Sequence, residues 1–339
     1  MIPTARFSLV LSVLTLLFLT AFSPDERSGE KAIIEIPQGF PELNFPEDNA
    51  FTQARWELGK RLFYDPILSV DSSLSCASCH KSDLAFADNL PKTPGVFDRP
   101  GKRNAPTLAN VAWLPYTLFE GSVPTLEMQI LVPIQEHNEF DFNIVLIAEK
   151  LNKQASYVEM SQKAYQRTPD AFVITRAIAT FERSLISGNS RYDQFEFQGN
   201  TSALSELEQK GKDLFFSSKT NCSACHSSVF FTSFEFKNNG LYDEYTDEGR
   251  YHFTGIPADS GLFKIPTLRN IELTAPYMHD GSVQTLEEVV NHYNSGGSSF
   301  KNKDQLIKAL GLSEDEKLQL VAFLKTLTDD EFVDNELLK

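Results

Sequence analysis

Apolar positions along this chain recur mostly with the period of a helix. Amphipathic patterns predict helices over residues 58–64, 142–165, 170–186 and 210–216, and an apolar face over 320–327 predicts another helix. Few segments show the strict alternation of apolar and polar residues that indicates paired strands. We therefore expect a mainly α-helical fold with little sheet.

Three of the expected helices have a start signal in the sequence. A Ser or Thr followed three residues later by Glu forms a capping box, in which the two side chains bond free backbone amides at the helix start. Stretches rich in Gly, Pro, Asn and Asp, at 81–105 and 227–265, predict long loops between helices. The capping boxes are Ser205 with Glu208, Thr285 with Glu288, and Ser313 with Glu316.

The first residues have the layout of an export signal. Arg6 is followed by a run of apolar or small residues from 7 to 22, and then by polar residues. This run is short for a membrane span, so we assign 1–23 to a secretory signal peptide, with Pro24 a poor residue after a cut. No later segment reaches spanning length. We therefore expect a periplasmic mature chain without a membrane span.

The balance of charge narrows the range of partners. The chain of 339 residues carries 31 Lys and Arg against 46 Asp and Glu, which gives a net charge of −15. A nucleic-acid binder would need a basic surface, so this class is excluded. An acidic surface favours a basic or neutral protein partner. The length and the hydrophobic fraction of 41% suit two globular domains.

All four cysteines lie in two copies of one motif, C-x-x-C-H. This motif attaches c-type haem, because two thiols at this spacing reach the vinyl groups on one porphyrin edge and the adjacent His binds the iron. Export supports this interpretation, since c-type haem is attached outside the cytoplasm. The first copy is Cys76, Cys79 and His80, and the second is Cys222, Cys225 and His226.

Three other uses of the cysteines fit the pattern less well. Two structural disulfides would not need a His after each pair, and a four-cysteine zinc site would leave both histidines coincidental. A redox-active C-x-x-C usually occurs once, near a βαβ pattern that this sequence lacks. We therefore expect two covalently bound haem c groups.

An internal repeat indicates that the chain has two similar halves. Residues 106–130 and 266–290 are identical at 10 of 25 positions. Each half runs from an amphipathic helix through C-x-x-C-H, a loop, P-T-L-x-N and G-S-V-x-T-L-E to another helix. We expect two tandem cytochrome-c-like domains, at 35–190 and 200–330, with long loops around a haem in place of a sheet.

In combination, these motifs resemble the bacterial di-haem cytochrome c peroxidase family, including its MauG branch, over residues 35–330. The segments that carry the resemblance are S-C-A-S-C-H, K-R-N-A-P-T-L, C-S-A-C-H, P-T-L-R-N-I-E-L-T-A-P-Y-M-H-D-G and T-L-E-E-V-V-N-H-Y. The resemblance implies that the N-terminal haem reacts with hydrogen peroxide and that the C-terminal haem passes electrons to it. It implies a small cytochrome c or cupredoxin as electron donor.

The resemblance also implies an acid and base at the first haem. The family uses a Glu with a Gln ten residues earlier, and the matching positions here are Glu139 and Gln129. We expect Glu139 to move a proton between the two oxygens of peroxide and Gln129 to orient the bound molecule. Without the resemblance, Glu139 would be interpreted as a solvated surface charge.

The residues expected on the far side of each haem, opposite the motif histidine, differ from those of the classical branch of the family. A classical distal His near position 96 is replaced by Val96, so we expect an open first haem, as in the MauG branch. The classical Met ligand of the second haem is replaced by Tyr293, whose hard oxygen favours oxidised iron. His292 and Met278 are alternative ligands near this position.

Family resemblance further implies a calcium ion between the domains. The side chain of Asn104 and the carbonyls of Thr274 and Pro276 match its ligands, and oxygen donors suit this hard cation. The alternative for Asn104 is an ordinary turn residue. His279 is expected close to the second haem.

Three functions remain open after these comparisons of motifs. The main hypothesis is a peroxidase, and the second is a MauG-like oxidase of a protein or small organic substrate, which Val96 and Tyr293 favour. Phe119 weakens the second hypothesis, because the family usually has a Trp between the haems and Trp113 cannot be assumed to replace it. A non-catalytic electron carrier is the third, and Glu139 speaks against it.

Overall fold

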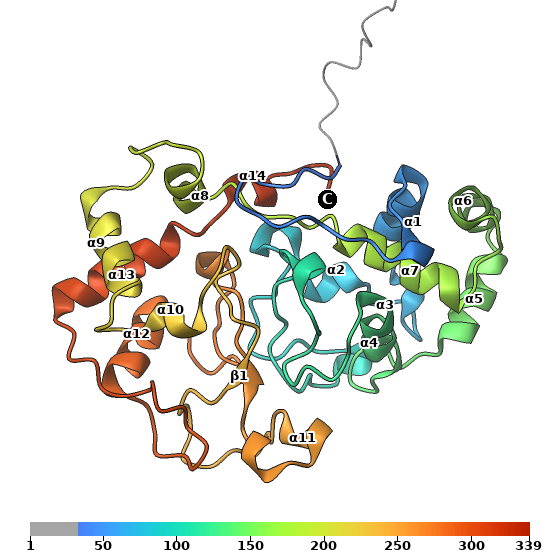
Figure 1. Ribbon diagram of the computed structural model, residues 1–339. Coiled ribbons are helices and arrows are strands. Elements are labelled where there is room, and N and C mark those ends of the chain that lie inside the picture. Colours follow the sequence, from blue (N-terminus) through green and yellow to red (C-terminus); the bar gives the residue numbers. More distant parts are fainter. Residues whose placement is uncertain (1–32) are drawn as a thin grey trace, which may run out of the picture. The chain divides into compact units, whose positions relative to one another are not determined.

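The computed structural model describes residues 33–339, so the signal peptide expected at 1–23 lies outside the described residues. Helices dominate, and the sheet in the described part consists of two short strands (Figure 1). The expectation of a mainly α-helical fold is confirmed. Within residues 33–339, no helix has the length and apolar character that crossing a membrane requires.

Short helices and turns connect a few longer helices. Strands β1 (Phe236–Lys237) and β2 (Phe263–Lys264) pair antiparallel. The first half contains α1 (Gln53–Tyr64), α2 (Cys76–Cys79), α3 (Leu126–Gln129), α4 (Leu131–Gln135), α5 (Ile144–Asn152), α6 (Ala155–Tyr165) and α7 (Ala171–Glu182). The second half contains α8 (Arg191–Glu196), α9 (Glu206–Phe215), α10 (Cys222–Cys225), α11 (Tyr251–Thr254), α12 (Leu286–Ser295), α13 (Glu314–Lys325) and α14 (Asp330–Val333). The 3-10 helices are η1 (Glu47–Asn49), η2 (Pro66–Leu68), η3 (Ser82–Leu84), η4 (Val96–Asp98), η5 (Val111–Trp113), η6 (Pro257–Asp259) and η7 (Ile271–Leu273).

The expected helix starts are confirmed, but the region 142–165, which was expected to form one helix, forms two. Capping boxes open α9, α12 and α13 where the sequence places them. The single helix expected over 142–165 is wrong, because α5 ends at Asn152 and α6 begins at Ala155. The Asn152 amide donates to the carbonyls of Ala148 (2.8 Å) and Pro169 (2.7 Å), and these bonds hold the chain in the turn between the helices.

Each half is built around a pair of crossing helices, α1 with α7 and α9 with α13, which lie side by side in Figure 1. A glycine lies at each crossing. A Cβ atom on Gly59 would lie 1.9 Å from the carbonyl oxygen of Ala177, and one on Gly211 would lie 1.9 Å from that of Gln319. Any side chain at these positions would push the helices apart, so the close packing depends on both glycines.

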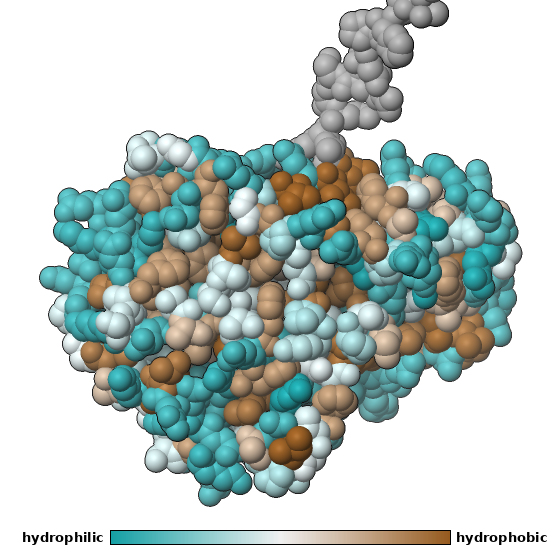
Figure 2. All heavy atoms as spheres, viewed as in Figure 1, coloured by the Kyte–Doolittle hydropathy of each residue, from teal (hydrophilic) through white to brown (hydrophobic). Residues whose placement is uncertain are grey.

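Two separate clusters of buried apolar side chains fill the described part of the chain. In the first, the rings of Phe63 and Phe181 lie 5.0 Å apart, and in the second those of Phe215 and Phe323 lie 5.2 Å apart. Hydrophilic side chains prevail on the face drawn in Figure 2, with apolar ones scattered among them. Each cluster belongs to one pair of crossing helices.

Segment 332–338 packs back onto the first half. Phe332 and Leu338 are buried in the first apolar cluster. The hydroxyl of Tyr64 donates to the carbonyl of Leu338 at 2.6 Å, and the ammonium of Lys60 donates to that of Leu337 at 2.9 Å. The core of the first half is therefore completed by residues that follow the second half in sequence.

The two P-T-L-x-N motifs meet at one residue. Asn110 and Asn270 both have positive φ, at 62° and 59°, which Asn tolerates better than most residues. The Asn110 amide donates to the Ser187 carbonyl at 2.8 Å, and the Asn270 amide donates to the Ser187 hydroxyl at 2.9 Å. The same hydroxyl donates to Asp329 at 3.1 Å. One Asn from each repeat therefore holds the connection between the halves.

A buried ion pair in the second half gives a test of this fold. Arg269 donates two bonds to Asp193, at 2.8 and 2.7 Å, and both side chains are fully buried. We expect Arg269→Met to lower the free energy of unfolding by about 3–5 kcal/mol, because Asp193 would remain as an unpaired buried charge. Urea denaturation of the haem-loaded protein measures the change.

Lys210→Met is the matched control, since Lys210 forms an exposed pair with Glu206. Exposed pairs contribute little to stability. A loss at Arg269 no larger than that at Lys210 would contradict the role assigned to the buried pair.

Candidate functional site

The first C-x-x-C-H motif forms a single helical turn followed by its histidine. Helix α2 spans Cys76–Cys79, and Ser75 and Ser78 form a capping box at its start. The Nδ1 atom of His80 lies 2.9 Å from the carbonyl oxygen of Phe86. A carbonyl only accepts, so Nδ1 carries the hydrogen and Nε2 keeps its lone pair. His80 is thus prepared to bind a metal through Nε2.

The second motif repeats this geometry. Helix α10 spans Cys222–Cys225, and Nδ1 of His226 lies 3.0 Å from the carbonyl oxygen of Phe231. Burial lowers the pKa of both His80 and His226, which keeps the two imidazoles neutral. A neutral imidazole whose second nitrogen is bonded to a backbone carbonyl is the arrangement of most metal-binding histidines.

The surroundings of the four cysteines favour an uncharged form of their sulfur atoms. None of the four is in a disulfide, and burial raises the pKa of each thiol group, that of Cys79 to about 12. A zinc site would need thiolates, which this environment disfavours, whereas thioethers carry no charge. Nowhere in residues 33–339 do three or more His, Cys, Asp or Glu side chains gather as metal ligands.

The two motif histidines are shielded from water by the surrounding protein. His80 and His226 are only partly accessible, and burial is the main cause of their lowered pKa. Neutral imidazoles beside paired cysteines fit two covalently attached haem groups.

Glu139 lies in a desolvated environment on the first half. Its side chain is accessible, but burial and the negative charge of Glu136 raise its pKa to about 7, against the opposing effect of Lys102. Lys102 does not pair with Glu139, because its ammonium is bonded to Glu136 at 3.1 Å. At neutral pH, the Glu139 carboxyl is therefore present in both protonation states.

The structure places Val96 directly beside Glu139. The backbone N–H of Val96 donates to the carbonyl of Glu139 at 2.9 Å, and the Val96 side chain is only 1% exposed. The neighbouring Gly95 permits this contact, since a Cβ there would lie 2.0 Å from the carbonyl oxygen of Asn138. The backbone at Val96, whose side chain cannot bind a metal, is thus bonded to the backbone of the expected proton carrier.

Gln129 and Glu139 flank helix α4 on its two sides. Gln129 ends α3 and is half-buried, and α3 is held by the bonds of Glu127 to Arg183, at 2.6 and 3.0 Å. In the described residues no hydrogen bond joins Gln129 to Glu139. The pairing of the two side chains stays a prediction.

The three candidate ligands for the second haem gather around Asn239. The His292 Nε2 lies 3.0 Å from the carbonyl oxygen of Asn239, and the Asn239 amide donates to the sulfur of Met278 at 3.3 Å. Burial raises the pKa of Tyr293, and a hydrogen bond from the Asn239 side chain opposes this. The nearby thiols of Cys222 and Cys225 raise it further, so Tyr293 lies close to the second motif. All three side chains therefore have a polar partner on Asn239, and Tyr293 as the ligand stays a prediction.

An ionic and aromatic cluster joins the two halves. Arg103 from the first half donates to both oxygens of Asp247, at 2.6 and 2.9 Å, and to Glu120. The ring of His279 stacks on Phe263 at 4.1 Å, and its carbonyl accepts from the backbone N–H of Asn104 at 2.9 Å. This last bond brings the expected calcium ligand Asn104 to the segment that contains Thr274 and Pro276. The calcium site itself stays a prediction.

Phe119 lies in this cluster and Trp113 does not. The backbone N–H of Lys264 donates to the carbonyl of Phe119 at 2.7 Å. The Arg103 guanidinium lies 5.9 Å from the Phe119 ring. Trp113 instead packs against Phe40 and Phe230, at 5.6 and 5.3 Å. Trp113 therefore does not take the position of the missing Trp.

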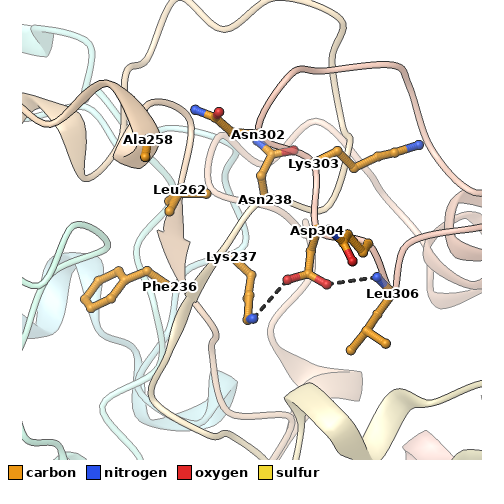
Figure 3. A pocket seen from close by; sticks show the side chains of 10 residues that line it. Phe236, Lys237, Asn238, Ala258, Leu262, Asn302, Lys303, Asp304 and Leu306 are labelled. Carbon is orange, nitrogen blue, oxygen red and sulfur yellow. Dashed lines mark hydrogen bonds and ion pairs between the residues drawn. The ribbon is translucent and has the colours of Figure 1, made fainter.

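An open hollow of about 570 Å³ lies on the second half (Figure 3). Phe236, Leu262 and Leu306 line it, and Figure 3 shows the ion pair of Lys237 with Asp304, 2.9 Å long. Two lysines and one aspartate line it, and neither Glu139 nor a motif histidine does. We therefore do not assign peroxide chemistry to this hollow.

Glu182 is a chemically unusual residue that the sequence reasoning missed. Its side chain is 5% exposed, and its Oε2 atom has no hydrogen-bond partner among the described residues. Burial raises its pKa to about 8, opposed by Arg183, which is already paired with Glu127. Its charge in turn raises the pKa of Cys76, which places it near the first motif. The available signal was an acidic residue at the end of helix α7, most of whose residues are apolar.

Comparisons with known proteins agree on one family. A family model described as di-haem cytochrome c peroxidase matches residues 53–202. The methylamine utilization protein MauG of Methylorubrum extorquens is 35% identical over 309 residues, which is 90% of this chain and 86% of that protein. The cytochrome c551 peroxidase of Nitrosomonas europaea is 34% identical, covering 81% of this chain and 80% of that protein.

Solved structures give the same result. A MauG-like protein associated with microbial copper homeostasis has a TM-score of 0.85 at 34% identity, covering 90% of this chain and 98% of that one. The di-haem peroxidase BthA of Burkholderia thailandensis, at 22% identity and a TM-score of 0.73, supports the fold alone.

The buried Glu182 predicts a specific pH dependence of stability. Its folded pKa of about 8 lies above the ordinary value of 4.5, so its contribution is fully present below pH 4.5 and is lost as the pH rises towards 8. We expect Glu182→Gln to remove a slope of about 1.4 kcal/mol per pH unit in this window.

Denaturation of both proteins across this pH range measures the difference. Glu149→Gln, on the accessible surface of α5, is the control and should leave the slope unchanged. Equal slopes for wild type and Glu182→Gln would show that Glu182 is not neutral in the folded state.

Proposed function

Because the chain belongs to the di-haem cytochrome c peroxidase and MauG family and is an oxidoreductase, we propose that it reduces hydrogen peroxide to water. The reaction takes place at a haem on the first C-x-x-C-H motif, with electrons relayed through a haem on the second. The bound haem irons supply the electron transfer to peroxide. The chain supplies attachment, orientation and proton movement.

The motif residues fix the position of each haem. Thioether bonds from two cysteines hold one edge of the group, and the bond of the histidine Nδ1 to a backbone carbonyl fixes the ring plane. His80 would serve the peroxide-reducing site and His226 the electron-relaying site. Tyr293 is proposed as the second ligand of the latter.

Glu139 is proposed to move a proton between the two oxygens of peroxide. A carboxyl with a pKa of about 7 accepts and releases protons equally well at neutral pH, which suits a shuttle. Gln129, at the end of α3, is proposed to orient peroxide by hydrogen bonding.

The observation that carries the proposal is the contact of Val96 with Glu139. The buried Val96 stands where the classical branch has its distal His, and its backbone N–H is bonded to the carbonyl of Glu139, so this position offers no side-chain ligand to a haem iron. The first haem would thus accept peroxide in its oxidised state. An electron carrier has no need of a proton carrier at such a place.

A second candidate is a MauG-like oxidation of a protein or small organic substrate by peroxide. Tyr293 favours it, since a hard oxygen ligand stabilises oxidised iron. The similarity to MauG and to a MauG-like protein associated with microbial copper homeostasis points in the same direction. Phe119, which is harder to oxidise than Trp, weighs against charge sharing between the haems.

Further parts of the proposal concern organisation and location. The haem domains are proposed to span 35–190 and 200–330, each containing one C-x-x-C-H motif. Export by the signal at 1–23 would place the protein in the periplasm, where a small cytochrome c or cupredoxin serves as donor. A calcium ion bound by Asn104, Thr274 and Pro276 would strengthen the contact between the halves.

The open first haem can be tested by adding hydrogen peroxide to the fully oxidised, haem-loaded protein. We expect an immediate change of the Soret band without prior reduction, because the side chain of Val96 has no atom that could bind the haem iron in place of peroxide. A long-lived change favours the MauG-like candidate. Absence of any change until one electron is added would refute the open-site argument.

The proton shuttle can be tested with Glu139→Gln. General acid–base catalysis contributes typically 10²–10⁴-fold, so we expect the peroxide reaction to slow by about this factor. In the wild type, the rate should fall as the pH drops below about 7, because the protonated carboxyl cannot accept a proton. Stopped-flow spectroscopy between pH 5 and pH 8 measures both effects.

Glu136→Gln is the matched control. Glu136 raises the pKa of Glu139, so its removal should shift the pH profile to lower pH and keep the maximal rate. A Glu139→Gln protein that reacts at the wild-type rate would exclude Glu139 as the shuttle.

A further inference from the structure

Tyr242 combines access to solvent with a strong proton acceptor. Its side chain is 36% exposed, and its hydroxyl donates to the Oδ2 atom of Asp280 at 2.6 Å. Asp280 belongs to the H-D-G segment of the second repeat. Its carboxylate accepts a bond from the backbone N–H of Ser282 at 3.1 Å, which fixes its position. A short bond between a phenol and a carboxylate is a charge-assisted hydrogen bond.

The proton of this bond belongs to the tyrosine in the resting protein. Burial and Asp280 raise the pKa of Tyr242. Burial would raise the pKa of Asp280, but the bonds from Tyr242 and Ser282 and the nearby His279 outweigh it and lower that pKa. The pair is thus a neutral phenol beside an ionised carboxylate. An oxidised phenol is a strong acid, and Asp280 is placed to take its proton.

Tyr245 connects this pair with the interior of the second half. The rings of Tyr242 and Tyr245 lie 5.6 Å apart, and the Tyr245 hydroxyl accepts from the backbone N–H of Leu241 at 2.9 Å. The Tyr245 ring lies 6.1 Å from the ring of His279, which is expected close to the second haem. Aromatic rings therefore lead from the surface at Tyr242 through Tyr245 to His279.

The surface around Tyr242 is acidic. Asp243 and Glu244 follow it directly and are exposed, and Asp280 lies at its hydroxyl. Clustered carboxylates attract a basic partner and orient it during encounter. The exposed phenol is thus surrounded by charges that suit one class of protein.

We propose that Tyr242 is the point at which electrons enter from a basic, one-electron donor protein, and that Asp280 keeps the phenol proton while the tyrosine is oxidised. The inference rests on the peroxide reduction proposed above. It names the class of donor and the path by which its electrons enter the second half.

The electrons and protons balance over one turnover. Each peroxide takes up two electrons and two protons and yields two waters. In each of two encounters, Tyr242 passes one electron inward through Tyr245 while its proton moves to Asp280. The donor then returns one electron to the tyrosyl oxygen, and Asp280 returns the proton. The two protons that enter water come from solvent, and two donor molecules are oxidised.

The first test is electron paramagnetic resonance on the haem-loaded protein, freeze-quenched after one equivalent of hydrogen peroxide without donor. We expect a tyrosyl signal that Tyr242→Phe abolishes and Asp280→Asn weakens, because the amide cannot accept the proton. Tyr251→Phe is the matched control, since Tyr251 is half-buried in the same half and its hydroxyl has no carboxylate partner in the described residues. It should keep the signal.

The second readout is the oxidation rate of a reduced basic cytochrome c at saturating peroxide. We expect Tyr242→Phe to lower this rate about tenfold and salt to lower the wild-type rate through its acidic surface. Consumption of peroxide without a Tyr242-dependent signal or rate overturns this inference and leaves the peroxidase proposal intact. Failure of the wild type to consume peroxide overturns both.

Discussion

The bond from each motif histidine to a backbone carbonyl is the interaction on which the functional part of this structure depends. His80 bonds Phe86 and His226 bonds Phe231, in both cases through Nδ1. The bond fixes the tautomer, aims Nε2 into the interior and requires the following loop to turn back on itself. Because the loop must close over the ring, most of the chain after each motif has no regular secondary structure.

The repeat preserves this scaffold and varies the chemistry. Gly59 and Gly211 allow the same close helix crossing, and Asn110 and Asn270 hold the same connection. The loops between these points differ. Where the first half has Phe119, the second has His279, stacked on Phe263. Packing constraints are thus common to both halves, whereas side chains that face the interior spaces or the partner half are free to diverge.

The sequence was sufficient for features that depend on neighbouring residues. Capping boxes placed the starts of α9, α12 and α13. The break between α5 and α6 was missed because Asn152 bonds Pro169, which lies in a later loop.

Features of the site that arise from tertiary contacts were not visible in the sequence. Glu182 has an unusual environment only because the folded chain removes every donor from its Oε2 atom. A backbone bond across 43 positions brings Val96 to Glu139, and a side-chain bond across 38 positions brings Tyr242 to Asp280. Residue identity predicted the chemistry, but burial and long-range partners decide which side chains can perform it.

The return of segment 332–338 onto the first half has a consequence for biosynthesis. Leu338 reaches the core of the first half from 274 positions beyond Tyr64, with which it is bonded. A chain that is synthesised from the N-terminus onwards cannot complete the apolar core of the first half before the second half has been made. The apolar core of the first half is therefore completed only after both motifs have been made.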